Sequence, residues 1–303
     1  MPRLWISMLK WSKRWLLLVL AFLLSGFAWV TYDQAYNFIN HPKEVRELGS
    51  KTPEDVGLSV GEVVITNPQG MHLYGYYSPS KNGAYVMLQH GFKSDRSYLL
   101  EEAKILQDAG YGVLVTSVRA HDKNDGQVIT FGVREMQDLQ AWYEYLAAQG
   151  AAPGKVGILG NSMGAAMVIE YASRNNDIAA VVSVSGFSSL QDTINVSVEY
   201  FTGLPAFPFA PAIATWAQWL LGMEVAQVDA TKAAAKLCQT PILVMQGGAD
   251  TVVSVASGQW IYDAACGTKE LWFDEDVGHT KFDRDRPQEY ARRVTQFFAQ
   301  HLL

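Results

Sequence analysis

From residue 62 onward, the sequence alternates short apolar runs with longer helical patterns, and this alternation constrains the fold more than any other feature. Several runs are apolar at every position, as expected for strands buried on both faces of a parallel sheet. The strand candidates are 62–66, 72–77, 84–89, 112–118, 155–159, 178–185, 241–246 and 270–274. The helix candidates are 97–109, 134–148, 163–174, 254–265 and 287–301. We therefore predict an α/β fold with a mostly parallel eight-stranded sheet flanked by helices.

One interval between strand candidates is far longer than the others. Residues 187–237 span about fifty positions, whereas strand–helix connections usually take 2–6. The centre of this insertion, 201–223, is apolar and proline-rich, and it carries Trp216 and Trp219. Because the insertion follows the carboxyl end of a strand, where α/β sheets bind ligands, we predict a helical cap over an active site, with both tryptophans near the substrate. Extra core packing is the alternative.

An uncharged stretch lies near the N-terminus. Residues 15–32 carry no charge and follow four basic residues, and eighteen helical residues span roughly 27 Å, close to the hydrocarbon thickness of a bilayer. Aromatic residues flank both ends of the stretch, as they do at membrane interfaces. We predict a single-pass anchor in the inner membrane. The resulting segments are a cytoplasmic N-terminus (1–14), a transmembrane anchor (15–32), a connecting segment (33–60) and an extracytoplasmic domain (61–303).

Two other interpretations of the stretch remain. Gly26-Phe27-Ala28 fits the small-x-small pattern of a signal-peptide cleavage site, and cleavage there would leave a secreted or periplasmic protein. A buried helix of the globular domain is the third interpretation. For either an anchor or a signal peptide, the basic N-terminus stays in the cytoplasm and the rest of the chain lies outside the inner membrane.

The charge and cysteine content exclude several classes of protein. The net charge is −6 and only 18% of residues are charged, so no basic face for nucleic acid is expected. The two cysteines form no CxxC pair and no Cys/His cluster at zinc spacing. We therefore expect neither a nucleic-acid partner nor a metal site.

The motif Gly160-Asn161-Ser162-Met163-Gly164 lies between the strand candidate 155–159 and the helix candidate 163–174. A G-x-S-x-G motif at such a junction is typical of a nucleophile elbow, in which Ser162 is lifted clear of the sheet. Gly160 and Gly164 flank a turn so sharp that side chains there would collide. The helix N-terminus also favours developing negative charge. We predict that Ser162 is a nucleophile, and the alternative is that the glycines only close a tight corner.

A serine nucleophile needs a base and an acid that orients the base. His279 follows the strand candidate 270–274 and Asp250 follows 241–246, so both lie at the carboxyl edge of the predicted sheet. We predict His279 as the base and Asp250 as the acid. The rivals are His121 for the base and Asp192, Asp274 and Asp276 for the acid.

An oxyanion hole needs two aligned N–H donors. One is expected from Met163, which follows the nucleophile, and the other from Phe92, in the loop after the strand candidate 84–89. Gly91 permits an unusual backbone conformation in that loop, and we expect His90 to support the loop rather than act as the base.

Taken together, these motifs resemble the α/β-hydrolase superfamily, in particular its membrane-anchored or secreted bacterial branch. The resemblance covers residues 52 to 300, and the order Ser162, Asp250, His279 matches it. Its motifs are TPED (52–55), HGFKSD (90–95), VRAHDKNDG (118–126), ITFGVREMQDLQAWYEYL (129–146), GNSMG (160–164), QGGAD (246–250) and GH (278–279). A serine at the elbow argues against the branches with a carboxylate nucleophile. Many relatives carry R-G-H-G-x-S where this chain has RAHDKN (119–124).

The resemblance implies a serine hydrolase that acts by acyl transfer without a cofactor. The apolar insertion and the predicted anchor favour an uncharged, fairly hydrophobic substrate, either a small-molecule or a lipid-like acyl ester. A peptidase or amidase, or another acyl transferase, would use the same triad. A peptidase would need an anchor for a peptide terminus, for which Glu199 and Glu224 are the candidates. A binding protein without activity is a further alternative, and the natural substrate and oligomeric state stay open.

The two cysteines each precede a late strand candidate. Cys238 precedes 241–246 and Cys266 precedes 270–274, so neighbouring parallel strands would bring both to the same sheet edge. A disulfide is then geometrically possible in an extracytoplasmic domain. Two unpaired cysteines are the equally weighted alternative.

Overall fold

A computed structural model describes the backbone of residues 2–303 and the side chains from Lys13 onward. Eight strands form one sheet in the order β1-β2-β4-β3-β5-β6-β7-β8, in which β2 runs antiparallel to both neighbours and the remaining pairs are parallel. The strands are β1 (Gly61–Thr66), β2 (His72–Ser78), β3 (Tyr85–Gln89), β4 (Gly112–Thr116), β5 (Val156–Asn161), β6 (Ile178–Val184), β7 (Ile242–Gly247) and β8 (Lys269–Asp274). The predicted sheet is confirmed.

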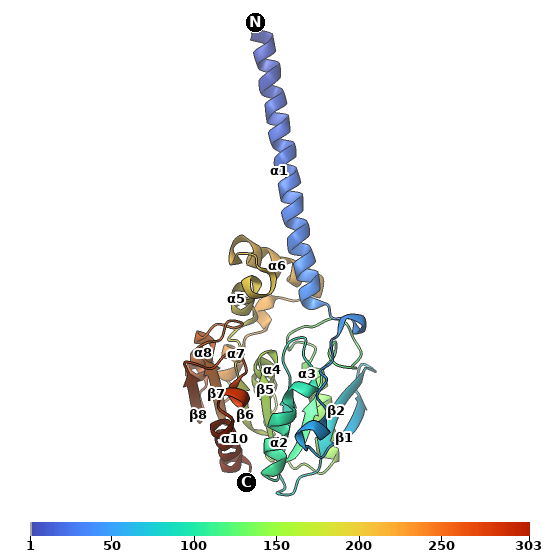
Figure 1. Ribbon diagram of the computed structural model, residues 1–303, viewed down its shortest axis with the longest axis vertical. Coiled ribbons are helices and arrows are strands. Elements are labelled where there is room, and N and C mark those ends of the chain that lie inside the picture. Colours follow the sequence, from blue (N-terminus) through green and yellow to red (C-terminus); the bar gives the residue numbers. More distant parts are fainter. Residues whose placement is uncertain (1) are drawn as a thin grey trace.

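Helices cover both faces of the sheet (Figure 1). On one face, α2 and α10 pack together against the central strands, and on the other α3, α4, α7 and α8 form a row. The helices are α1 (Pro2–Ile39), α2 (Leu100–Asp108), α3 (Met136–Ala148), α4 (Met163–Ala172), α5 (Leu190–Thr202), α6 (Ala206–Leu221), α7 (Ala230–Ala234), α8 (Ala256–Ala264), α9 (Phe282–Asp285) and α10 (Pro287–Leu302). Short 3-10 turns occupy Lys43–Val45, Pro53–Val56, Arg96–Leu99 and Val225–Gln227.

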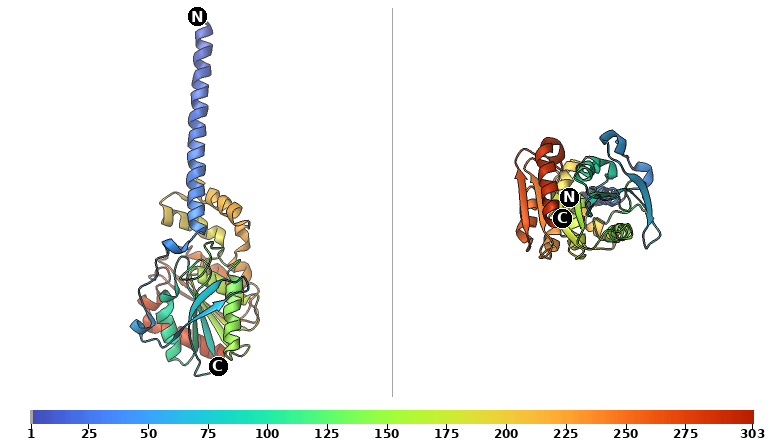
Figure 2. Two further views of the ribbon diagram at one scale, coloured as in Figure 1. Left: turned by 90° about the vertical axis from the view of Figure 1, so that its right-hand side faces the viewer. Right: turned by 90° about the horizontal axis from the view of Figure 1, so that it is seen from below.

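Helix α1 is much longer than the predicted span at 15–32. Its free end lies at the opposite end of the molecule from the C-terminus (Figure 2). The stretch Lys13–Ile39 is apolar and long enough to cross a membrane, and most of it is exposed. The other end of α1 enters the domain, where Ala35 and Ile39 are buried in the core.

The expected connecting segment 33–60 is therefore largely part of the domain. After α1 ends, His41 N–H donates to the carbonyl of Gln127 at 2.7 Å. The Arg46 guanidinium donates to a cluster of carbonyl oxygens in the loop after β4, including that of Asn124 at 2.7 Å. These bonds join segments about eighty residues apart, and a local sequence pattern carries no signal for such pairing.

The insertion 187–237 divides into two parts. Helices α5 and α6 lie beyond the carboxyl ends of the strands, beside the lower part of α1 (Figure 1). Helix α7 instead packs between α4 and α8, within the layer that covers the sheet. Only α5 and α6 thus have the position predicted for a cap. The Ala-rich helix α7 instead buries its small side chains in the core.

A disulfide joins Cys238 and Cys266, with 4.7 Å between the Cα atoms. Both residues lie at the amino-terminal edge of the sheet, where Ile242 of β7 pairs with Lys269 of β8. The disulfide hypothesis is confirmed, and the alternative of two unpaired cysteines is wrong.

Candidate active site

Ser162 occupies a sharp turn between β5 and α4. Its backbone has φ 56° and ψ −119°, a conformation that non-glycine residues rarely adopt. A Cβ atom at Gly160 would collide with the backbone of Gly164, and one at Gly164 would collide with carbonyl oxygens at the end of β3. Both glycines are therefore required by close backbone approach, and the turn holds the Ser162 hydroxyl above the sheet, directly before the first residue of α4.

A continuous chain of hydrogen bonds links Ser162, His279 and Asp250. The Ser162 hydroxyl lies 2.8 Å from Nε2 of His279, and Nδ1 of His279 lies 2.7 Å from Oδ2 of Asp250. A carboxylate can only accept, so Nδ1 carries the proton and Nε2 is free to accept the hydroxyl hydrogen. The structure thus brings together the three residues that the sequence analysis selected.

Further bonds fix the orientation of the acid and the base. The second carboxylate oxygen of Asp250 accepts the N–H groups of Val252 at 2.9 Å and Val253 at 3.0 Å. On the other side of His279, the N–H of Thr280 donates to the hydroxyl of Ser185 at 3.0 Å. Ser185 lies directly after β6 with φ 51°. These bonds hold both loops at the carboxyl edge of the sheet.

The rival acids and the rival base lie elsewhere. Asp192 is in the first turn of α5, and Asp274 is engaged by the Arg286 guanidinium at 2.9 Å. Asp276 is exposed. His121 is fully buried, and its ring contacts the loop after β3 rather than Ser162. Its Nε2 accepts the N–H of Lys93 at 3.1 Å.

The loop after β3 lies against the serine. A Cβ atom at Gly91 would be 3.2 Å from the Cβ of Ser162, so only glycine lets the loop approach this closely without displacement. Within the described part of the chain, the N–H groups of Phe92 and Met163 donate to no other protein group. The two expected oxyanion donors are thus near the serine and available to a ligand. His90 donates from Nδ1 to the Gly91 carbonyl at 2.9 Å.

Three buried histidines support this loop from beneath. The ring centroids of His41 and His121 are 5.6 Å apart, and those of His121 and His90 are 5.0 Å apart. Burial lowers the pKa of His41 to about 4 and holds the pKa values of His90 and His121 below the ordinary value. All three are therefore neutral near pH 7, as the acceptor role of His121 requires.

Ser162 lies between an apolar cavity and a polar cleft. The apolar cavity has a volume of about 240 Å³ and is walled mainly by aromatic and aliphatic side chains. The polar cleft, about 160 Å³, also contains His279. The apolar walls include Phe38, Phe92, Phe131, Phe187, Phe201 and Val253, and the cleft walls include Ser94, Glu102, Asn161, Asp283 and Arg284. An ester at Ser162 would thus have different surroundings on its two sides.

Glu102 gives the polar cleft a neutral acid. One oxygen of Glu102 accepts from the side-chain amide of Asn161 at 3.0 Å, and the other is buried without a partner among the side chains from Lys13 onward. Burial, together with the nearby Asp283 carboxylate, raises the pKa of Glu102 to about 8. Glu102 is therefore protonated near neutral pH and can donate a hydrogen bond.

The two tryptophans predicted to meet the substrate do not line the cavity at Ser162. The Trp216 indole donates to the hydroxyl of Thr31 in α1 at 3.1 Å, and Trp219 is exposed. Neither tryptophan has the predicted position, because Trp216 packs against α1 and Trp219 lies at the surface. The carboxylate candidates Glu199 and Glu224 are exposed and lie outside the cavity as well.

Sequence reasoning missed several residues around the site. Phe38 comes from the predicted connecting segment, and Lys93 comes from a loop. Ser185 lies at the end of a strand, and Glu102 lies in a helix. Glu102 carried a usable signal, because it is an acidic residue on the apolar side of a predicted helix. Phe38 carried none, since its position depends on where α1 docks.

Comparison with known proteins places these features in a wider group. Residues 71–210 match the sequence profile of the X-Pro dipeptidyl-peptidase family, S15. An uncharacterised protein of Bacillus subtilis, YqkD, is 23% identical over 237 residues, which is 77% of each chain.

Solved structures share the fold over most of this chain. An esterase of Pyrococcus furiosus, Pf2001, superposes with a TM-score of 0.71 at 26% identity, covering 88% of this chain and 100% of the esterase. An acylaminoacyl peptidase of Pyrococcus horikoshii superposes with a TM-score of 0.62 at 16% identity, covering 80% of this chain and 42% of the peptidase. The second likeness concerns the fold alone.

Proposed function

Because this chain belongs to the α/β-hydrolase superfamily of serine hydrolases, we propose that it cleaves carboxylic esters of an uncharged, fairly hydrophobic acyl substrate. The observation that carries the proposal is the hydrogen-bond chain from Asp250 through His279 to Ser162, next to an apolar cavity. The esterase with the same architecture adds support.

In the proposed reaction, the Ser162 hydroxyl oxygen attacks the ester carbonyl carbon while Nε2 of His279 takes the hydroxyl proton. The N–H groups of Met163 and Phe92 stabilise the oxyanion. The bond to the alcohol oxygen then breaks, and His279 gives its proton to that oxygen. Water attacks the acyl-enzyme with His279 again as the base, which releases the acid and restores Ser162. Asp250 keeps the imidazole in the required tautomer.

The apolar cavity favours an acyl group, and the polar cleft favours the alcohol. Aromatic and aliphatic walls bind hydrocarbon because they remove it from water, and they offer little to a charged peptide terminus. The S15 profile and the peptidase likeness keep an amide substrate as the second candidate. The exposed positions of Glu199 and Glu224 speak against their use as an anchor for a peptide terminus.

We also propose that α1 anchors the enzyme in the inner membrane, with the N-terminus in the cytoplasm and the catalytic domain outside. The apolar stretch of α1 and the basic residues before it support this orientation. The disulfide between Cys238 and Cys266 supports an oxidising compartment for the domain. A secreted protein released by signal cleavage is the alternative.

The test is a panel of 4-nitrophenyl esters of increasing chain length, together with aminoacyl anilides, on the wild type and on Ser162→Ala. We expect ester hydrolysis by the wild type and a loss of roughly a thousandfold or more in kcat/KM for Ser162→Ala. Ser173→Ala, at the other end of the same helix, is the matched control and should retain full activity. Undiminished hydrolysis by Ser162→Ala would refute the mechanism, and anilide turnover with inert esters would favour a peptidase.

A further inference from the structure

Helix α6 has no charged residue on any face, although it lies on the outside of the domain. No Asp, Glu, Lys or Arg occurs between Glu199 and Glu224. Phe207 is 82% exposed and Trp219 is 70% exposed. Helix α10 has the same length of 16 residues, yet its exposed face carries Arg292 and other polar side chains. A helix facing water normally has such a polar face, so the exposed face of α6 suits an apolar environment.

Helix α6 packs against α1 within the length that α1 needs to cross a bilayer. Starting after Arg14, about 20 helical residues span the roughly 30 Å of hydrocarbon. The ring of Phe27 lies 5.2 Å from that of Phe209, and Thr31 accepts the Trp216 indole N–H. Phe27 and Thr31 are about 20 Å and roughly 26 Å along the helix from Arg14. For the proposed span, α6 thus lies at the depth of the outer leaflet.

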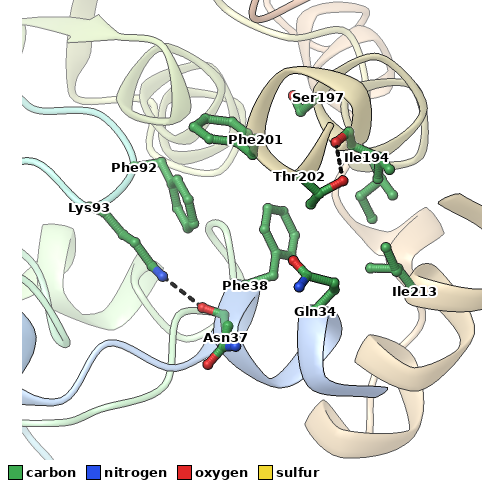
Figure 3. A pocket seen from close by; sticks show the side chains of 11 residues that line it. Gln34, Asn37, Phe38, Phe92, Lys93, Ile194, Ser197, Phe201, Thr202 and Ile213 are labelled. Carbon is green, nitrogen blue, oxygen red and sulfur yellow. Dashed lines mark hydrogen bonds between the residues drawn. The ribbon is translucent and has the colours of Figure 1, made fainter. Parts of the chain in front are cut away.

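A second apolar cavity lies between α1, α5 and α6 and has a volume of about 290 Å³. Gln34 and Phe38 reach it from α1, Ile194 and Phe201 from α5, and Ile213 from α6 (Figure 3). Its walls are chiefly hydrocarbon, and the polar residues that also line it are Gln34, Asn37, Lys93, Ser197 and Thr202. The cavity is therefore walled jointly by the membrane helix and by the helix at leaflet depth.

The two apolar cavities share walls. Phe38, Phe92, Phe201 and Ser197 line both the cavity at Ser162 and the cavity beside α1. The ring of Phe38 is 5.3 Å from that of Phe92, whose backbone N–H is the proposed oxyanion donor. An acyl chain attached at the serine can thus run along these rings toward α1. The polar cleft lies on the other side of the serine and suits a polar alcohol.

We propose that the cavity between α1, α5 and α6 binds the chain of a long-chain acyl ester that enters from the outer leaflet of the membrane. Helix α6 sits in that leaflet, and the ester carbonyl reaches Ser162 while its alcohol lies in the polar cleft. This inference rests on the proposed esterase function and names its substrate as a membrane-resident acyl ester.

The first experiment detects the chain without requiring turnover. Full-length Ser162→Ala protein in phosphatidylcholine vesicles is irradiated with a palmitoyl ester that carries a diazirine near the end of its chain. We expect labelled peptides from 34–38 and from 194–213. Gln34→Trp in the same background fills the cavity and should reduce this labelling at least tenfold. Labelling elsewhere, or labelling unaffected by Gln34→Trp, would overturn the acyl site.

The second experiment measures turnover in the same vesicles. Gln34→Trp in the otherwise native chain should lower palmitoyl ester hydrolysis at least tenfold and leave acetyl ester hydrolysis within twofold. Tyr36→Trp adds an indole on the same turn of α1 but outside the cavity, and it should change neither rate. Ile213→Trp fills the cavity from α6 and should repeat the result. Equal effects on long and short esters would overturn the proposal.

The two experiments separate the site from the chemistry. Labelling of the cavity without ester hydrolysis by the native chain would refute the esterase function while the acyl site stands. Ester hydrolysis with no labelling of the cavity would refute the acyl site alone. The leaflet position of α6 has its own measurement: vesicles of brominated lipid should quench the fluorescence of the native protein more than that of Trp219→Phe. Equal quenching would overturn that position.

Discussion

Ala120 and Asp122 in the loop after β4 adopt the left-handed backbone conformation that glycine favours, with φ of 61° and 51°. Glycine adopts this conformation without strain, whereas any other residue incurs a cost of about 1–3 kcal/mol. Contacts hold this loop in place. The Asp122 carboxylate lies 2.7 Å from the Arg96 guanidinium, and the Ala120 N–H donates to the backbone carbonyl of Asp125. These contacts therefore hold the backbone that presents His121 to the oxyanion loop.

His121 gives a prediction at this scale. His121→Leu removes the acceptor for the Lys93 N–H, which leaves a partly buried donor unpaired next to Phe92. We expect kcat for ester hydrolysis to fall about tenfold with KM nearly unchanged. His121→Gln places an oxygen near the position of Nε2 and should recover most of the rate. Equal losses in the two variants would contradict a role for the accepted hydrogen bond.

His121 and the other buried histidines also determine how the free energy of unfolding changes with pH. Below the ordinary histidine pKa of about 6.5, these histidines bind protons in the unfolded chain but stay neutral in the folded chain. The free energy of unfolding therefore falls as the pH falls. For His41 this loss continues to about pH 4. His121→Gln removes one such group, and thermal unfolding at pH 7 and pH 5 should show a smaller acid loss than in the wild type.

At the scale of elements, α1 is both the proposed anchor and part of the catalytic domain. Leu24 on its outer portion is 59% exposed, whereas Ala35 and Ile39 are buried in the domain core and Phe38 walls the site. Lys93, next to the oxyanion donor, donates to the carbonyl of Asn37 near the end of α1 at 2.6 Å. The position of the oxyanion loop is thus tied to the docking of α1.

Two truncations of side chains on α1 separate these roles. Ile39→Ala deletes buried methyl groups and should lower the free energy of unfolding by about 2–4 kcal/mol. Leu24→Ala on the exposed portion should change it by less than about 0.5 kcal/mol. Denaturant unfolding of the full chain in detergent measures both. Similar values for the two variants would show that the end of α1 is not part of the domain core.

In the whole molecule, the active site and the disulfide lie at opposite edges of the sheet. Ser162, Asp250 and His279 follow the carboxyl ends of strands, and Cys238 and Cys266 precede the amino ends of β7 and β8. Helix α1, the proposed anchor, and α6 are on the active-site side (Figure 1). The fold thus turns its catalytic edge toward the proposed membrane and its covalent link away from it.

This arrangement predicts stability without an effect on catalysis. The disulfide closes a loop with a sequence separation of 28, so replacing both cysteines with alanine should lower the free energy of unfolding by about 3–4 kcal/mol. Ester hydrolysis at 25 °C should be unchanged. Reductant should destabilise the wild type by a similar amount and leave the double variant unaffected, as thermal unfolding would measure. A large loss of activity would contradict the separation of the two edges.

The strands and the three residues of the hydrogen-bond chain were predictable because their signals are local. Apolar runs mark β3 to β7, the glycines on both sides of Ser162 mark the turn, and Asp250 and His279 follow strands directly. The partners of α6 were not predictable, because Trp216 reads equally well as a substrate contact or as a contact with α1. The same holds for Phe38, whose neighbours come from three distant segments.

Local sequence patterns were enough to predict the sheet, the order of the motifs and the three residues of the hydrogen-bond chain, since backbone periodicity and turn chemistry act over a few residues. The packing of distant segments was needed to establish that the end of α1 enters the core, that neither tryptophan of α6 reaches Ser162, and that two apolar cavities meet at Phe38. Those outcomes depend on which apolar surfaces bury each other, and many pairings of such surfaces satisfy the same local pattern.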